Sequence, residues 1–161
     1  MASGIYNRLK YNLAKKLVDL SIDTIKVILL NNSHSFNADH NVNTDINTNE
    51  ITGTGYTTGG ETIGSPTVTQ NDTSDKMVFD GADVAWTTAT FTAYHAALVD
   101  TSVSNNLCGS IDFGGAKTVT GGTFTIQTNG VELVTINTSG ANSLRSTNLT
   151  VPLGTYTVTM I

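Results

Sequence analysis

Residues 76–100 read KMVFDGADVAWTTATFTAYHAALVD, and this stretch indicates the fold class most clearly. Apolar and polar residues alternate in it, and it is rich in threonine, valine and aromatic residues, which suit a pleated surface. Two short strands are expected at Lys76–Asp80 and Asp83–Thr87, on either side of a turn at Asp80-Gly81, and a longer strand at Thr90–Asp100. This part of the chain is therefore predicted to be all β.

The same pattern continues toward the C-terminus. Asn105-Asn106 marks a turn, and Asn129-Gly130 is a strong signal for a hairpin with a two-residue turn. Further strands are expected at Leu107–Phe113, Gly122–Thr128, Val131–Ile136, Leu144–Val151 and Thr155–Ile161. About 8–10 strands at this spacing are typical of a β-sandwich or a β-barrel. The tail at Asn137–Ile161 is a candidate for an extra hairpin, a swapped arm or an attachment segment.

Upstream of residues 76–100, one further buried strand and a long loop are expected. Thr24–Leu30 (TIKVILL) is short, apolar and β-branched, and Asn31-Asn32 ends it. Asn31–Asn49 is polar and rich in asparagine, and long loops of this kind tend to be functional or mobile. No linker or change in composition divides the chain, so we expect a single domain over residues 1–161.

An amphipathic helix is predicted at the N-terminus, within residues 1–22. Apolar residues recur every three or four positions between Ile5 and Leu20, at Tyr6, Leu9, Leu13, Leu17 and Leu20. Half of the basic residues of the chain lie in the same segment, mostly off this stripe: Arg8, Lys10, Lys15 and Lys16. The simplest interpretation is a helix packed on the sheet with a solvated basic face. Contact with a membrane surface and docking on an acidic partner are the alternatives.

Charge and composition exclude several classes of protein. Only 13% of the residues are charged, and the formal net charge of −5 argues against nucleic-acid binding. No apolar run reaches the ~18 residues of a membrane span. The Met1–Gly4 start and the segment after it lack the apolar core of a secretory signal. A single cysteine, Cys108, excludes an internal disulfide framework and is expected to be an inert packing residue.

Two groups of residues could bind metal ions, but neither has a recognised spacing. The first group, in the asparagine-rich loop, is His34, Asp39, His40 and Asp45, and it does not match HExxH. The second group is Asp72, Asp75, Asp80 and Asp83, and it lacks the order of a helix-flanked Ca²⁺ loop. Solvated loop residues and turn caps are the simpler interpretations. We therefore expect no metal and no cofactor.

No catalytic arrangement is recognisable in the sequence. There is no serine on a G-x-S-x-G elbow, and Gly53-Thr54-Gly55 lacks the lysine and the helix of a phosphate-binding loop. His95 lies in an alternating strand, where a buried structural role is more common than that of a base. The sequence thus predicts a protein that is not an enzyme and has no small-molecule substrate.

Four blocks of sequence, in this order along the chain, resemble the sequences of a known protein family. They are DTIKVILL at 23–30, NEITGTGYTTGGETI at 49–63, MVFDGADVAWTTATFTAYHAALVD at 77–100 and LCGSIDFGGAKTVTGGTFTI at 107–126. Together they resemble a family of small structural virion proteins of tailed bacteriophages, described as capsid decoration, head or tail-associated proteins. The resemblance covers roughly Asp23 to Ile126. The chain departs from the family pattern at His95, where an Arg-Tyr pair is frequent nearby, and in the tail at Asn137–Ile161.

The residues that carry the resemblance look like fold determinants. They are Asp23, Lys26, Glu50, Gly53, Gly55, Tyr56, Gly59, Gly60, Asp83, Trp86, Asp112, Phe113, Gly114, Gly122 and Phe124. Glycines allow positive φ or a close approach of two backbones. Trp86 and Phe113 are expected to anchor the core.

The resemblance implies a capsid decoration, or cement, protein in the virion, assembled in the cytoplasm of the bacterial host. Its partners would be the major capsid protein and further copies of itself, because decoration proteins often form trimers at symmetry points of the shell. The basic N-terminal helix could then face an acidic patch of the shell. A head–tail connector or tail component is the first alternative. A carbohydrate-binding or host-adhesion module is an alternative from another class.

Overall fold

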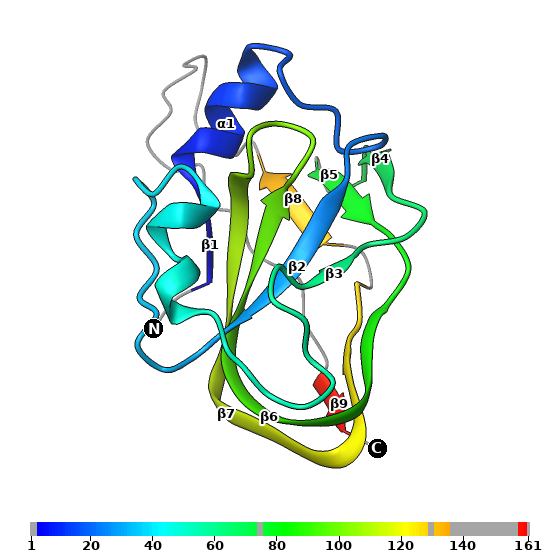
Figure 1. Cartoon of the computed structure of the whole chain (residues 1–161). Helices are drawn as coiled ribbons and strands as arrows, with labels where there is room; N and C mark the ends of the chain where they lie inside the picture. Colours follow the sequence, from blue (N-terminus) through cyan, green and yellow to red (C-terminus); the bar gives the residue numbers. More distant parts are fainter. Residues whose placement is uncertain (1–2, 74–75, 129–130, 136–157, 161) are drawn as a thin grey trace.

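The computed structural model describes residues 3–73, 76–128, 131–135 and 158–160 (Figure 1). This part of the chain is mostly β with one short N-terminal helix, which confirms the predicted fold class. The strands are β1 (Gly4–Ile5), β2 (Ile25–Leu30), β3 (Glu61–Thr62), β4 (Thr67–Asn71), β5 (Lys76–Asp80), β6 (Val84–Asp100), β7 (Asn106–Ile126), β8 (Val131–Thr135) and β9 (Val158–Met160). The helices are α1 (Asn7–Ala14) and two 3-10 helices, η1 (Asn43–Asp45) and η2 (Asn47–Asn49).

The strands form two antiparallel sheets. The larger sheet has the order β1-β7-β6-β2-β3, and β9 also pairs with β7. The smaller sheet has the order β4-β5-β8. The hairpin of β6 and β7 runs along most of the molecule, with α1 near one end and β9 near the other (Figure 1). Because Phe79 of β5 packs in the same apolar core as Trp86 and Phe124 of the larger sheet, the two sheets share one core, as in a sandwich.

Strands that the sequence pattern separates are continuous in the structure. The predicted strands at Asp83–Thr87 and Thr90–Asp100 are both part of β6, and Thr88 between them has φ +51°. The register against β7 shifts between Trp86 and Ala89, so the interruption is a β-bulge and not a loop. In the same way β7 runs through the glycine pairs that follow Phe113 and precede Thr123.

The hairpin predicted at Asn129-Gly130 is wrong in its pairing. Val131–Thr135 pairs with β5, with Val134 opposite Met77, whereas the end of β7 pairs with β6 and β9. The chain therefore passes from one sheet to the other between β7 and β8. Residues 129–130 lie outside the described residues, as do the predicted strand at 144–151 and all of the 137–161 tail except Val158–Met160. β9 in that tail pairs with Phe124–Ile126 of the larger sheet.

At β2 the larger sheet is buried on both faces, which explains why the sequence of this strand is almost entirely apolar. Val27 and Leu29 belong to the main core between the sheets, and Ile28 and Leu30 belong to a second cluster on the opposite face. This second cluster consists of Tyr6, Ile28, Leu30, Ile46, Ala97, Val99 and Leu107, with Phe36 against it.

Residues 31–50 cover the second cluster, and we call this segment the cover. It contains η1 and η2 and contributes Ile46, which is fully buried, and Phe36. One backbone hydrogen bond joins the two ends of the cover to each other, Asn31 N–H to Asn49 O (2.8 Å). Two others attach its middle to the rest of the fold, Leu107 N–H to Asn41 O and Asn7 N–H to Ala38 O (both 2.9 Å). The long loop expected here is thus a packed element of the fold.

Candidate docking surface

The N-terminal helix is shorter than the apolar stripe predicts, because the chain turns sharply after Ala14. The Leu17 N–H donates to Asn12 O (2.9 Å) and the Lys16 N–H donates to Leu13 O (3.2 Å). This pair of bonds is a Schellman motif, which requires a left-handed residue, and Lys16 supplies it with φ +55°. Helix ends of this type usually carry glycine, so the sequence gives no warning of the stop. The helix expected within residues 1–22 therefore covers only Asn7–Ala14.

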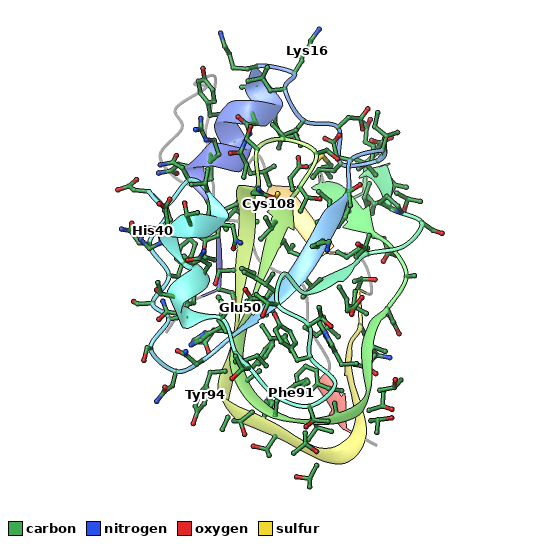
Figure 2. All side chains as sticks on the ribbon, viewed as in Figure 1. Lys16, His40, Glu50, Phe91, Tyr94 and Cys108 are labelled. Carbon is green, nitrogen blue, oxygen red and sulfur yellow. The ribbon has the colours of Figure 1, made fainter. Side chains whose placement is uncertain are left out.

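The four predicted partner-binding residues are divided by this helix end. Arg8 and Lys10 lie on α1 and are half-buried, and the Lys10 ammonium donates to Oδ1 of Asn7 (3.2 Å). Lys15 and Lys16 lie beyond the last helical turn and are exposed, and Lys16 projects from the end of the molecule (Figure 2). Positive charge at a helix C-terminus is favoured by the helix dipole. The structure therefore places two of the four basic residues at one exposed end.

Two exposed apolar side chains, Leu17 and Val68, line a groove at the same end. Four large apolar side chains of the described residues are exposed: Tyr11, Leu17, Ile22 and Val68. Leu17 is 53% exposed, although its place in the stripe predicted burial, and Ile22 is 78% exposed. Isolated exposed apolar residues are normal on protein surfaces, but a group of them beside one groove is typical of an interaction site.

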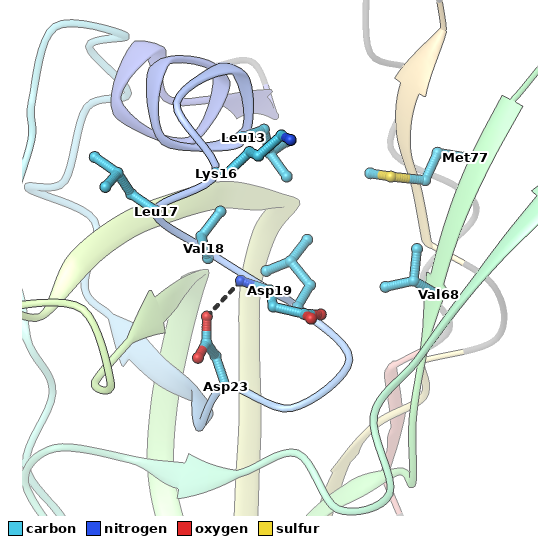
Figure 3. Close-up of a pocket in the computed structure, with 9 residues that line it drawn as sticks. Leu13, Lys16, Leu17, Val18, Asp19, Asp23, Val68 and Met77 are labelled. Atoms are coloured by element: carbon cyan, nitrogen blue, oxygen red, sulfur yellow. Dashed lines mark hydrogen bonds between the residues drawn. The ribbon is translucent and has the colours of Figure 1, made fainter.

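The groove lies between the turn after α1 and the smaller sheet, and Figure 3 shows its two walls. It has a volume of about 490 Å³. One wall is Leu13, Lys16, Leu17, Val18, Asp19, Leu20 and Asp23, and the other is Val68 of β4 and Met77 of β5. The rim thus combines a lysine and two carboxylates with an apolar floor. We call the groove together with Tyr11, Lys15 and Ile22 the docking surface.

Hydrogen bonds hold the acidic part of the rim in place. The Asp19 N–H donates to Oδ2 of Asp23 (2.7 Å), and the Ser21 N–H donates to Oδ1 of Asp19 (3.0 Å). The Ser21 hydroxyl donates to the same oxygen, and these bonds lower the pKa of Asp19. Asp19 therefore stays charged at neutral pH. Sequence reasoning missed Asp19, Ile22 and Val68, because nothing local shows that residues 13–23 meet β4.

The first candidate metal group serves the fold instead. His34 is buried, with Nε2 3.1 Å from the Ser110 hydroxyl, so the expectation of a solvated loop histidine is wrong. Oδ1 of Asp39 accepts from the Asn7 side chain (2.9 Å). Oδ2 of Asp45 accepts the N–H groups of Asn41 and Val42, which lower the pKa of Asp45. No group of three possible metal ligands occurs among the residues that the structure describes.

The second candidate group is dispersed along turns. Asp72 accepts from the side chain of Gln70, and Asp80 accepts from the N–H of Gly81 (2.8 Å). Oδ1 of Asp83 accepts from the N–H of Thr128 (3.2 Å), which ties the start of β6 to the residues after β7. Asp75 lies outside the described residues. Each described member of this group thus accepts a hydrogen bond within the fold.

The glycine-rich motif packs across the bulge of β6. The Thr90 N–H donates to Thr54 O (2.9 Å), so the loop runs beside the strand. A Cβ at Gly53 would lie 2.7 Å from Cβ of Phe91, and one at Gly55 would lie 2.9 Å from Cα of Ala89. Gly60 lies against β2, where a Cβ would lie 1.9 Å from Val27 O. Glycine is required at these positions because two backbones come together.

The aromatic residues of the motif blocks form part of the main core. Trp86 is buried, and its ring lies 5.9 Å from that of Phe124 and 6.1 Å from that of Tyr56. Phe113 is partly buried against the same core, with its ring 6.2 Å from Phe124. Beside it, Oδ1 of Asp112 accepts the N–H of Gly114 (2.9 Å), which has φ +70°. These contacts stabilise the sheets and leave the docking surface as the candidate site.

No helix within the described ranges is long and apolar enough to cross a membrane. The chain was also compared with known proteins, and no protein-family model, no curated protein and no solved structure matches it.

Proposed function

We propose that this chain is a non-enzymatic structural protein of a tailed-bacteriophage virion, and that it decorates the capsid. It binds the major capsid protein through the docking surface and associates with further copies of itself, with a trimer the first arrangement to test. The ordered sequence blocks between Asp23 and Ile126 support the virion class. The observation that carries the docking role is the groove at one end of the molecule, which is lined by the exposed side chains of Leu17, Val68 and Lys16.

The composition of this end suits a protein–protein contact. Apolar residues such as Leu17 and Ile22 supply area that binding removes from water, and a polar rim with Lys16 and Asp19 supplies orientation. Lysines that approach an acidic patch raise the rate of association and make it depend on salt. Four of the eight basic residues of the chain, Arg8, Lys10, Lys15 and Lys16, belong to the N-terminal segment that leads to this end, so positive charge is concentrated there.

The proposal is tested with phage heads that lack the protein. The variant Arg8→Gln/Lys10→Gln/Lys15→Gln/Lys16→Gln should bind such heads more weakly, and its binding should depend less on salt, because screening acts on the charges that it removes. Ile22→Ser should also weaken binding, without affecting folding, because the side chain is largely exposed. Binding is measured by co-sedimentation of the purified protein with the heads.

A matched pair of variants serves as the control. Lys15→Gln/Lys16→Gln and Lys26→Gln/Lys117→Gln remove the same number of charges, but Lys26 lies on β2 and Lys117 on β7, away from the groove. Only the first pair should weaken binding. Equal binding by both pairs and by wild type would show that the docking surface is assigned wrongly.

The number of copies per virion separates decoration from the alternatives. Hundreds of copies on the head are expected of a decoration protein, and a handful is expected of a connector or tail component. Cryo-microscopy that finds the chain nowhere on the head would overturn the proposal. A sugar-binding module needs exposed aromatic platforms, but the most exposed aromatic residue in the described ranges is Tyr11, at 51%. Binding to a glycan array would favour that alternative.

A further inference from the structure

Two histidines far apart in the sequence meet beneath the cover. His34 comes from the cover and His95 from β6, and they are only 1% and 4% exposed. Their ring centroids are 5.2 Å apart in an edge-to-face arrangement. Nε2 of His34 lies 3.1 Å from the Ser110 hydroxyl, whereas its Nδ1 is buried and has no hydrogen-bond partner among the described residues. The pair therefore links the cover to the β6–β7 hairpin.

The charged and titratable groups around the pair act differently on its two members. On the sheet, Oδ1 of Asp112 lies 3.6 Å from Nδ1 of His95 and offers that ring a counter-charge. On the cover, His40 adds a positive charge near His34 when it is protonated, and His95 does the same from the sheet. From the N-terminal segment comes the Tyr6 hydroxyl, whose pKa burial raises to about 12. His95 thus has a carboxylate beside it, and His34 has mainly cations.

Burial lowers the pKa of His34 to about 4, and the positive charges of His95 and His40 add to the effect. Burial also lowers the pKa of His95, although Asp112 acts in the opposite direction. An opened cover exposes His34 to water, where its pKa returns to 6.5. The open form then binds more protons than the closed form between these two values. The closed cover is consequently most stable above pH 6.5 and loses stability as the pH falls toward 4.

We propose that the cover is an acid-sensitive latch, in which protonation of the buried His34–His95 pair releases residues 31–50 from the face of the larger sheet. Ser110, Asp112 and the paired strands remain on the hairpin. The apolar contacts that hold the cover closed are made by its residues Phe36 and Ile46, which pack with the other members of the second cluster.

Release of the cover also loosens the N-terminal segment. The Asn7 N–H donates to Ala38 O, and the Asn7 side chain donates to Oδ1 of Asp39 (both 2.9 Å), so the first turn of α1 is held by the cover. The ring of Tyr6 packs on Phe36 with centroids 5.1 Å apart. These contacts join the histidine pair to the helix that leads into the docking surface. Acid should therefore weaken the attachment of residues 5–14 as well as that of the cover.

The test is hydrogen–deuterium exchange of the free, full-length protein at pH 7.5 and pH 5.0, with rates corrected for the intrinsic effect of pH. For His34 alone, the open population should rise about thirtyfold between these two conditions. Protection should fall in residues 31–50 and 5–14 and persist in β6 and β7. His34→Gln, which keeps a polar atom near Ser110 but cannot become charged, should remove most of this pH dependence. His40→Gln removes the other histidine of the cover and should keep most of the wild-type pH dependence, because burial is the main cause of the low pKa of His34 and His40 is the smallest of its three causes.

Several outcomes would overturn the proposal. They are a cover whose protection does not change with pH, an equal pH dependence in His34→Gln, and a loss of protection that is equal throughout β6 and β7, which would be global unfolding. If His34→Gln does not fold, an NMR titration of the three wild-type histidines decides the question. One histidine that titrates well below 6.5 together with loss of cover protection supports the latch, whereas three ordinary titrations with an intact cover contradict it. These measurements need no capsid, so they are independent of the proposed docking role.

Discussion

The Tyr56 hydroxyl donates a 2.6 Å hydrogen bond to Oε1 of Glu50 and accepts a 3.1 Å hydrogen bond from the N–H of Leu29. The same carboxylate oxygen accepts the N–H of Gly59 (2.7 Å). β3 pairs with β2 only at Lys26 and Val27, so Leu29 lies beyond its reach. The tyrosine thus satisfies a backbone donor of β2 at the point where the neighbouring strand is missing. These hydrogen bonds explain the spacing of Glu50, Tyr56 and Gly59 in the sequence block at residues 49–63.

Tyr56→Phe should lower the free energy of unfolding by about 2–3 kcal/mol, because it leaves both the Leu29 N–H and a charged acceptor without the hydroxyl. Glu50→Gln should lower it by about 1 kcal/mol, because the amide oxygen can still accept from Gly59. Urea denaturation of the two single variants and the double variant measures their coupling. Strictly additive effects would show that the two side chains do not act together.

Gly60→Ala and Gly59→Ala should differ sharply although the residues are neighbours. Both glycines have positive φ, +66° and +93°, so each substitution strains the backbone by about 1–2 kcal/mol. Only at Gly60 would the new Cβ collide with the chain, 1.9 Å from Val27 O, whereas nothing lies within 4 Å at Gly59. Gly60→Ala should therefore reduce the free energy of unfolding by more than about 3 kcal/mol. Similar urea midpoints for the two variants would contradict this assignment.

The local alternation of apolar and polar residues predicts where most strands lie, but it does not predict which strands pair or where one strand continues into the next. Alternation with a period of two is visible within a few residues, and it placed Lys76–Asp80 correctly. The continuity of β6 through Thr88 depends on a bulge against β7, and the pairing of Val131–Thr135 depends on β5. Both are contacts between residues that are distant in the sequence. Local sequence therefore predicts a strand end after Thr87 and a hairpin turn at Asn129-Gly130. The structure instead has a β-bulge at the first place, and at the second the chain passes from one sheet to the other.

The candidate site was predictable only in its charges. The cluster of basic residues in the sequence indicates Lys15 and Lys16. The groove beside them is not visible in the sequence, because it forms where residues 13–23 meet Val68 and Met77, about fifty positions later. The burial of His34 likewise depends on Ser110, which lies on a distant strand. By contrast, the burial of Trp86 and Cys108 followed from their strand positions and their apolar character, and the structure confirms it.

Lys16→Gly and Lys15→Gly should change stability in opposite directions. Each removes one positive charge from the end of α1, so their electrostatic effects are similar. Lys16 has φ +55°, where glycine relieves strain, and we expect a gain of up to about 1 kcal/mol after the entropy of the unfolded chain is considered. Lys15 has φ −91° and ψ −1°, where glycine only adds flexibility and costs about 0.5–1 kcal/mol. Thermal denaturation measures both, and a less stable Lys16→Gly would show that another interaction holds the helix end.

Asp100→Asn should stabilise the protein at neutral pH, because Asp100 is a buried carboxylate next to another acid. Its Oδ1 accepts the N–H groups of Ser102 (2.9 Å) and Val103 (3.1 Å) in the turn between β6 and β7, and asparagine can retain both bonds. Burial raises the pKa of Asp100, and the neighbouring Asp23 raises it further. A raised pKa in the folded state means that the contribution of Asp100 to stability is greatest below pH 3.8 and is lost as the pH rises through the folded value. The advantage of Asp100→Asn should therefore grow between pH 4 and pH 7.5.

The matched variant for this prediction is Asp100→Ala, which removes the negative charge and also both turn hydrogen bonds. It should lie about 2 kcal/mol below Asp100→Asn in the free energy of unfolding at every pH, because two backbone donors lose their acceptor. Urea midpoints of the wild type and the two variants across the pH range separate the charge from the hydrogen bonds. If Asp100→Asn were less stable than the wild type at pH 7.5, the ionised carboxylate would be stabilising the turn by more than its burial costs.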